Sequence, residues 1–286
     1  MLAANFWVVC MNISYKYSWR FGSTLLVTLI ARNIGQFGIN YVIMQFKNPK
    51  LKFSDLSGDV INLGLVRGML STLTSLFSTW SVMYLDYTEN QLIALTKPFL
   101  TMALNKLIFK EKILPIHILS GIMAFVGLIF IVQPPFIFSD GQYMLTSDKL
   151  KGVLYKLIAN IWNSLADLSI KNIGGKLDTH FIIHYMGIIN VFCFSLPFIL
   201  LEIPRIESLP CYFSLFMVGL FSFAVHLYYS KAYQFGKTNL IAVIEFSSIL
   251  FSLVADYFLL GRTYNLYDYL GTAILMIALY LVVAYK

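Results

Sequence analysis

Four ionisable side chains stand inside long apolar runs of this sequence, and they are its best candidates for chemistry. Lys97 interrupts the run LIALTKPFL and Glu245 interrupts IAVIEFSSI, while Arg32 and Asp167 lie in two further apolar stretches. A lysine or arginine attracts a carboxylate or phosphate, and a carboxylic acid carries a proton or pairs with a cationic group. Together these four residues predict a binding site for a small polar molecule.

The elements that position these residues are expected to be membrane helices. Of the 286 residues, 58% are hydrophobic and only 12% are charged, and the mean hydropathy is +0.74. These values are typical of a polytopic membrane protein. The apolar runs lack the strict alternation of a barrel, and backbone amides must be paired inside lipid, so the predicted fold class is all-α.

Runs of about 20 apolar residues bounded by charge, Gly or Pro predict ten transmembrane helices. They are residues 2–17, 23–44, 63–85, 91–109, 113–132, 152–170, 180–201, 211–232, 239–260 and 266–284. Ten such spans use about 200 residues, which leaves loops too short for a separate soluble or catalytic domain. No basic residue precedes the first span, so a cleaved signal peptide is not expected.

Lysine and arginine are distributed unevenly between alternate loops, which predicts the orientation of the chain. With a cytoplasmic N-terminus, the inner loops hold most of the lysines, including Lys47, Lys106 and Lys231, whereas the outer loops combine fewer basic residues with several acids. Both termini are therefore expected to face the cytoplasm. The net charge of +7 is explained by this topology, so nucleic-acid binding is not predicted.

The sequence also repeats itself, which predicts two related halves. The segment ANFWVVCMNISYK from Ala4 aligns with ANIWNSLADLSIK from Ala159, and NQLIAL aligns with TNLIAV. Five spans are followed by five more, and because five is odd, the second copy enters the membrane from the opposite side. We therefore expect an inverted repeat of residues 1–138 and 152–286, joined by a loop at 139–151, as in many secondary transporters.

The repeat aligns Lys97 with Glu245. Each stands about seven residues into its helix, or ~10 Å, counted from opposite membrane faces. We expect the two side chains on matching walls of one central cavity, where a charge within the membrane meets water or a partner. Pro98 predicts a bend that frees backbone carbonyls near this site. The alignment also pairs Trp80 with Tyr228 beside the cavity, although helix packing or an interfacial aromatic belt is the commoner explanation for such rings.

The other intramembrane charges have alternative interpretations. Arg32 either contacts the substrate or forms a structural pair with Asp167. Asp167 is alternatively the protonatable acid of a proton-coupled cycle or a neutral, hydrogen-bonded acid. Arg67 stands near a helix end, which favours snorkelling to the cytoplasmic headgroups. His226 has no ligand-like neighbours in sequence and is expected to be a packing residue.

The run NQLIALTKPFLTMALNKLIFKEKILP, followed by GIMAFVGLIFIVQPPFIF, resembles the EamA-like drug/metabolite transporter superfamily. With LVRGML and IVQPPFIF, the chain looks nearest to the subgroup G branch of solute carrier family 35, and residues 67–138 carry the more specific matches. The resemblance implies a ten-helix carrier with cytoplasmic termini and alternating access between two five-helix halves. The chain departs from its relatives at Lys97, where a small or hydroxyl residue is common, and at Phe246, where many have a second proline.

Motifs of catalytic and cofactor-binding proteins are absent from the sequence. It contains no G-x-x-x-x-G-K-[ST], G-x-G-x-x-G, G-x-S-x-G or H-E-x-x-H pattern, and Cys10, Cys193 and Cys211 have no paired spacing. We therefore expect no enzymatic activity, no cofactor, no bound metal and no disulfide framework.

These observations together predict a secondary transporter of a small polar metabolite, either an organic anion or a zwitterion, that works by alternating access. The candidate substrate-binding residues are Lys97, Glu245, Arg32, Asp167, Trp80 and Tyr228. The expected partners are the small-molecule substrate and membrane lipids, with a coupled proton and a homodimer as further options. A nucleotide-sugar exchanger of the secretory pathway and a non-transporting membrane scaffold are the alternatives, and the plasma membrane and an endomembrane both stay open.

Overall fold

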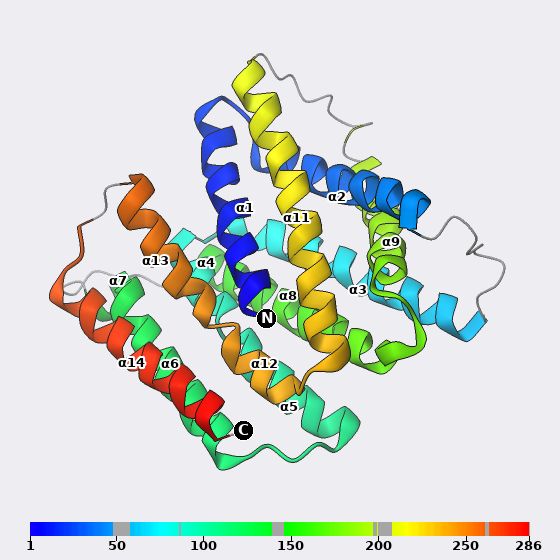
Figure 1. Ribbon diagram of the computed structural model, residues 1–286. Coiled ribbons are helices and arrows are strands. Elements are labelled where there is room, and N and C mark those ends of the chain that lie inside the picture. Colours follow the sequence, from blue (N-terminus) through cyan, green and yellow to red (C-terminus); the bar gives the residue numbers. More distant parts are fainter. Residues whose placement is uncertain are drawn as a thin grey trace. The chain divides into compact units, whose positions relative to one another are not determined.

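The computed structural model describes residues 1–47, 58–85, 87–138, 146–196, 199, 208–260 and 263–285, and the regular structure in these ranges is helical. A helix occupies each of the ten predicted spans, although the end of the span at 180–201 lies outside the described residues (Figure 1). The helices are α1 (Leu2–Arg20), α2 (Leu25–Lys47), α3 (Gly58–Val82), α4 (Tyr87–Ala94), α5 (Lys97–Phe109), α6 (Pro115–Val132), α7 (Pro135–Phe138), α8 (Ser147–Ile173), α9 (Thr179–Ile189), α11 (Leu209–Phe235), α12 (Thr238–Ile244), α13 (Ser247–Leu260) and α14 (Leu266–Ala284), with a 3₁₀ turn η2 (Gly174–Lys176) and a π-helical segment η3 (Asn190–Ser195).

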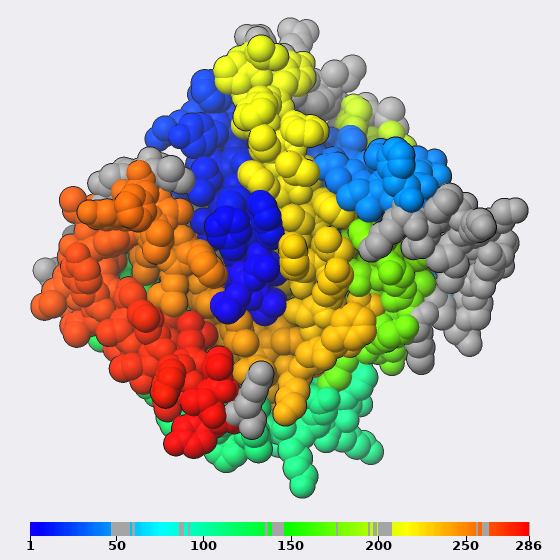
Figure 2. Space-filling view, viewed as in Figure 1, coloured from blue at the N-terminus to red at the C-terminus, as the bar shows by residue number. Residues whose placement is uncertain are grey.

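The distribution of side chains is that of a membrane protein. Five helical segments among the described residues are long and apolar enough to cross a membrane: Leu92–Phe109, Pro115–Val132, Leu209–Phe235, Thr238–Ala255 and Leu266–Ala284. The outer surface of α14, red in Figure 2, carries exposed apolar and aromatic side chains such as Tyr269, Ile277 and Tyr280. Polar residues such as Asn33 and Gln36 are buried instead. The all-α membrane class is thus confirmed, while ten membrane crossings and an inverted repeat stay predictions.

The starts of two helices follow local capping chemistry. α9 begins after Asp178, whose carboxylate accepts a hydrogen bond from the backbone N–H of His180 at 2.8 Å. α14 begins after Asn265, which forms a capping box with Asp268: each side chain accepts a hydrogen bond from the backbone N–H of the other residue. Such side chains satisfy backbone donors that the first helical turn leaves without partners.

The chain divides into two compact units, and each unit takes segments from both predicted halves. The first unit is Met1–Thr72 with Ser169–Phe235, and the second is Leu73–Leu168 with Gly236–Lys286. α3 and α8 therefore contribute residues to both units. This division differs from the boundaries predicted at 1–138, 139–151 and 152–286, and it leaves the predicted repeat untested.

In the first unit, α11 packs along α1 and crosses α2 (Figure 1). α2 and α11 approach closely at two glycines, because a Cβ at Gly35 would lie 2.6 Å from the Cα of Gly219. Small residues allow this kind of backbone contact between membrane helices. Hydrogen bonds between buried side chains add to the packing, such as the bond from Asn33 Nδ2 to Ser195 Oγ at 3.1 Å.

In the second unit, α6 and α14 run side by side (Figure 1). A Cβ at Gly127 would lie 2.7 Å from the carbonyl oxygen of Gly271, so these two helices also meet at a pair of glycines. Around this contact lies an apolar core that includes Leu128, Leu275 and Phe246, all fully buried. α5 and α12 pack against each other within the same unit, which positions the breaks described next.

Candidate functional site

Two helical segments of the second unit are interrupted, and Lys97 and Glu245 stand at the two interruptions. The break between α4 and α5 directly precedes Lys97, and the break between α12 and α13 includes Glu245. Pro98 explains the first break, because proline lacks the backbone N–H that a continuous helix would use. The second break has no proline; there Phe246 is fully buried, and the hydroxyl of Ser248 donates to the carbonyl oxygen of Glu245 at 2.9 Å.

Lys97, Asp167 and Glu245 form one ion network, which we call the charged triad. The Nζ of Lys97 lies 2.7 Å from Oδ2 of Asp167 and 3.1 and 3.0 Å from the two carboxylate oxygens of Glu245. The side chains of Lys97, Asp167 and Glu245 are 10%, 0% and 13% exposed, so the network is nearly closed to solvent. One cation between two acids leaves a net negative charge when all three are ionised. A proton or an added cationic group would balance it.

A polar face of α8 holds the triad against the broken helix. Asn160 Nδ2 donates to the carbonyl oxygen of Ile93 at 2.7 Å, and the hydroxyl of Thr101 donates to Ser164 Oγ at 2.9 Å. Asn160, Ser164 and Asp167 follow one another at helical spacing, so they share one face of α8. Neither Asn160 nor Ser164 was among the residues predicted for the site, although their spacing from Asp167 could have indicated them.

The structure brings together three of the six residues predicted to bind substrate, namely Lys97, Asp167 and Glu245. Asp167 forms an ion pair with Lys97, with 2.7 Å between Oδ2 and Nζ. Arg32, which was offered as an alternative partner of Asp167, lies on α2 in the first unit, where its Nη2 donates to Asn33 Oδ1 at 3.4 Å. The role of all six residues in substrate binding stays a prediction.

The two predicted aromatic residues lie in different units. Trp80 belongs to the second unit, and its ring centroid lies 5.4 Å from that of Phe77 and 5.7 Å from that of Tyr155. Tyr228 belongs to the first unit and lies on α11. Trp80 and Tyr228 are each 42% exposed, so neither is a core residue.

The first unit contains a cationic group of its own. Arg67 on α3 is only 4% exposed, so the predicted snorkelling to lipid headgroups does not describe its position.

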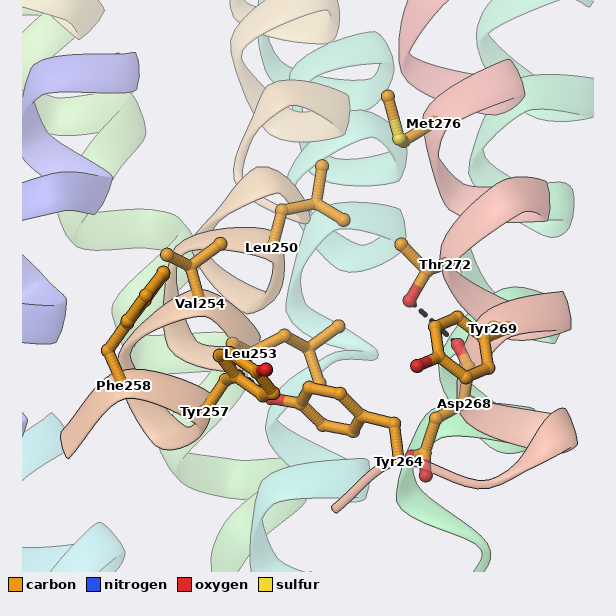
Figure 3. A pocket seen from close by; sticks show the side chains of 10 residues that line it. All are labelled: Leu250, Leu253, Val254, Tyr257, Phe258, Tyr264, Asp268, Tyr269, Thr272 and Met276. Atoms are coloured by element: carbon orange, nitrogen blue, oxygen red, sulfur yellow. Dashed lines mark hydrogen bonds between the residues drawn. The ribbon is translucent and has the colours of Figure 1, made fainter. Parts of the chain in front are cut away.

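The second unit also has an apolar pocket of about 530 Å³ between α13 and α14 (Figure 3). Figure 3 shows Tyr257 and Tyr264 close together at its wall, and Thr272 donates to the backbone carbonyl of Asp268 at 2.7 Å. Tyr264 donates to the carbonyl oxygen of Leu253. The hydroxyls of Thr272 and Tyr264 are therefore bound to the chain itself.

Metal chemistry has no support in the ranges that the structure describes. Within them, no group of three His, Cys, Asp or Glu side chains could hold a metal ion. Cys10, Cys193 and Cys211 are free cysteines.

Residues 150–284 match the sequence profile of the EamA-like transporter family. Asp167 and Glu245 fall within this EamA-like segment, whereas Lys97 precedes it. The match lies in the half of the chain whose sequence patterns were interpreted as less specific. The predicted resemblance to the EamA-like superfamily is thereby confirmed.

Two curated proteins are similar to this chain. The human protein named solute carrier family 35 member G1 is 22% identical over 197 residues, which are 66% of this chain and 53% of that protein. An uncharacterized membrane protein of Saccharomyces cerevisiae is 22% identical over 215 residues, 70% of this chain and 51% of its own length. The chain therefore spans about half the length of the curated relatives it matches, and the first of them agrees with the predicted subgroup G branch.

A solved structure described as "Crystal structure of protein" has the same fold. It is 11% identical, with a TM-score of 0.82 over 99% of this chain and 95% of the other. At this identity the likeness concerns the fold alone.

Proposed function

We propose that this chain is a secondary transporter of a small polar metabolite that works by alternating access, and that the charged triad binds the substrate. The observation that supports the proposal best is a nearly closed ion network at two helix breaks, in a chain with an EamA-like transporter domain. Broken membrane helices with charged groups at the break are typical binding sites of secondary transporters. A charge so deep in the membrane is costly, and function is the usual reason for keeping it.

The composition of the triad favours a zwitterion over a simple organic anion. Lys97 is already held by two acids, so a substrate carboxylate would have to pull it away from both. A substrate ammonium group would compete with Lys97 for one of the acids and would remove the net negative charge. The carboxylate or phosphate of the same substrate would then bind another cation.

A coupled proton would also balance the net negative charge of the triad. If either Asp167 or Glu245 takes a proton, the triad becomes neutral and one acid no longer holds the lysine. Protonation from one side of the membrane and release on the other would then couple the proton to substrate exchange. We further propose that both termini face the cytoplasm, as the loop charges predict.

The test begins with a thermal-shift screen of the purified protein against amino acids, organic acids and nucleotide sugars. A ligand that binds only the folded state stabilises it by mass action. We expect hits among the amino acids. A hit among the nucleotide sugars would instead support the alternative function of a nucleotide-sugar exchanger. No hit in any class would favour a non-transporting scaffold.

Uptake of the best hit into liposomes then tests the triad itself. Asp167→Asn and Glu245→Gln keep the shape of each side chain and remove its charge. We expect both variants to lose at least tenfold in uptake rate, because a proton-carrying acid is replaced by an amide. Asp148→Asn is the matched control, since Asp148 is 65% exposed and pairs with Lys151, one helical turn away. Unchanged uptake in both triad variants would remove the triad from the substrate site.

A further inference from the structure

Lys156 on α8 is a second lysine inside the second unit, and its surroundings differ from those of Lys97. Its Nζ lies 3.2 Å from the hydroxyl of Ser78 on α3. In the part of the chain that the structure describes, this hydroxyl is its hydrogen-bond partner and no carboxylate lies within ion-pair distance. Lys156 is half-buried, so its charge is partly removed from solvent and offset only by a neutral group. Such a cation attracts an anion strongly.

Aromatic rings pack around Tyr155, which is next to Lys156 in the sequence. Ser78 lies in sequence between Phe77 and Trp80, and both rings approach the ring of Tyr155, the residue next to Lys156. The centroids of Tyr155 and Tyr84 are 5.9 Å apart. Trp80 is 42% exposed and Tyr84 is 38% exposed, so these rings keep free surface for another molecule. A cation on the same two helices as accessible rings is suited to an anionic group that is attached to a flat or apolar body.

The position of Lys156 connects this place to the charged triad. Lys156 precedes Asn160 by one helical turn, and Asn160, Ser164 and Asp167 continue along the same face of α8. From Lys156 to Asp167 the helix rises by roughly 16 Å. The stretch begins at Lys156, whose partner is the neutral Ser78, and it ends at Asp167, one of the two acids that hold Lys97. The two ends of the stretch therefore differ in charge.

We propose that Lys156, Ser78 and the neighbouring ring of Trp80 form an anion subsite, which holds the carboxylate or phosphate of the transported molecule. The identity of the ligand rests on the proposed transport function, whereas the existence of an anion subsite does not. Under this proposal the anionic group of the substrate binds Lys156 rather than Lys97, because Lys97 is already held by two acids.

The experiment uses pyridoxal 5′-phosphate, a flat aromatic aldehyde with a phosphate group. Its aldehyde condenses with a lysine amine to an imine and water. Borohydride then delivers a hydride to the imine carbon and solvent supplies a proton, which fixes the label as a secondary amine for peptide mass spectrometry. The full-length protein is labelled in nanodiscs of zwitterionic lipid, with and without benzoate or inorganic phosphate as competitor.

We expect the labelling of Lys156 to saturate and to fall at least fivefold with either competitor. Lys106, an exposed lysine of α5, is the internal reference, and its labelling should rise linearly and ignore the competitors. Trp80→Leu should raise the half-saturating concentration at Lys156 by roughly 3- to 10-fold, the effect expected for one lost aromatic contact. Linear, unprotected labelling of Lys156, as at Lys106, would overturn the proposal.

Anionic lipid headgroups carry the same phosphate chemistry, so a second set of nanodiscs contains phosphatidylglycerol. If this lipid suppresses the labelling of Lys156 while benzoate and free phosphate do not, the occupant is a headgroup and the substrate subsite is refuted. If both soluble competitors still protect Lys156 in either lipid, the subsite binds a soluble anion. Because no uptake is measured, the labelling result stands apart from the outcome of the transport test.

Discussion

Replacing Lys97 by methionine should destabilise the second unit more than any other single change at the site. Methionine keeps the length of the apolar stem but leaves Asp167 and Glu245 next to each other without the cation that holds them. At an effective dielectric constant of about 20, one ion pair at the observed 2.7 Å amounts to roughly 6 kcal/mol before desolvation costs. Removing one partner of a buried pair typically costs about 3–5 kcal/mol. For a chain of this size that corresponds to a fall in Tm of roughly 10 °C.

The measurement is thermal unfolding of purified protein in detergent at a fixed heating rate, because unfolding of membrane proteins is often irreversible and scan-dependent. The informative comparison is a double-mutant cycle. Glu245→Gln in the Lys97→Met background removes one of the two acids, so it should cost less than Glu245→Gln alone, or even stabilise. A Tm for Lys97→Met within 1 °C of the wild-type value, or strictly additive effects in the cycle, would refute the buried-network reasoning.

Three other predictions concern packing and supporting contacts. Gly271→Ala should lower Tm clearly, because a Cβ at Gly271 would strike the backbone of α6. Gly38→Ala is the control and should be neutral or stabilising, since nothing lies within 4 Å of a Cβ at that position. Equal effects of the two substitutions would contradict the close approach of α6 and α14. Asn160→Leu should cost about 1–3 kcal/mol by leaving a buried carbonyl oxygen unsatisfied, measured as a Tm shift. Lys149→Ala should lower Tm more than Lys151→Ala, because only Lys149 pairs with a buried acid; the reverse order would count against that ion pair.

The sequence predicted the elements well because their signals are local. Long apolar runs and flanking charges located the helices, and Pro98 indicated the first helix break. The break at Glu245 was harder to foresee, since Phe246 is an ordinary helix residue whose burial depends on distant core packing. A break without proline leaves no signature in composition.

The pairing at the site was predicted only in part, because it depends on contacts between distant segments. The predicted internal repeat aligned Lys97 with Glu245, and these two side chains lie in contact. It gave no indication that Asp167 reaches the same lysine, because α8 has to be placed against the α4–α5 break first. Asn160 and Ser164 were overlooked for a similar reason, since single amides and hydroxyls in an apolar helix look like ordinary packing residues.

The charged triad also has a consequence for how the protein is made. Lys97 emerges from the ribosome 148 residues before Glu245, which is a delay on the order of ten seconds during synthesis. A lone lysine near the centre of a membrane helix disfavours insertion by about 3 kcal/mol. We therefore expect the segment around Lys97 to stay near water or the insertion machinery until its two counter-ions have been synthesised. These are Asp167 in α8 and Glu245, which directly follows α12. Nascent chains that stop before Asp167 should be held back or degraded, which ties the quality control of this protein to the same charges that are proposed to carry its substrate.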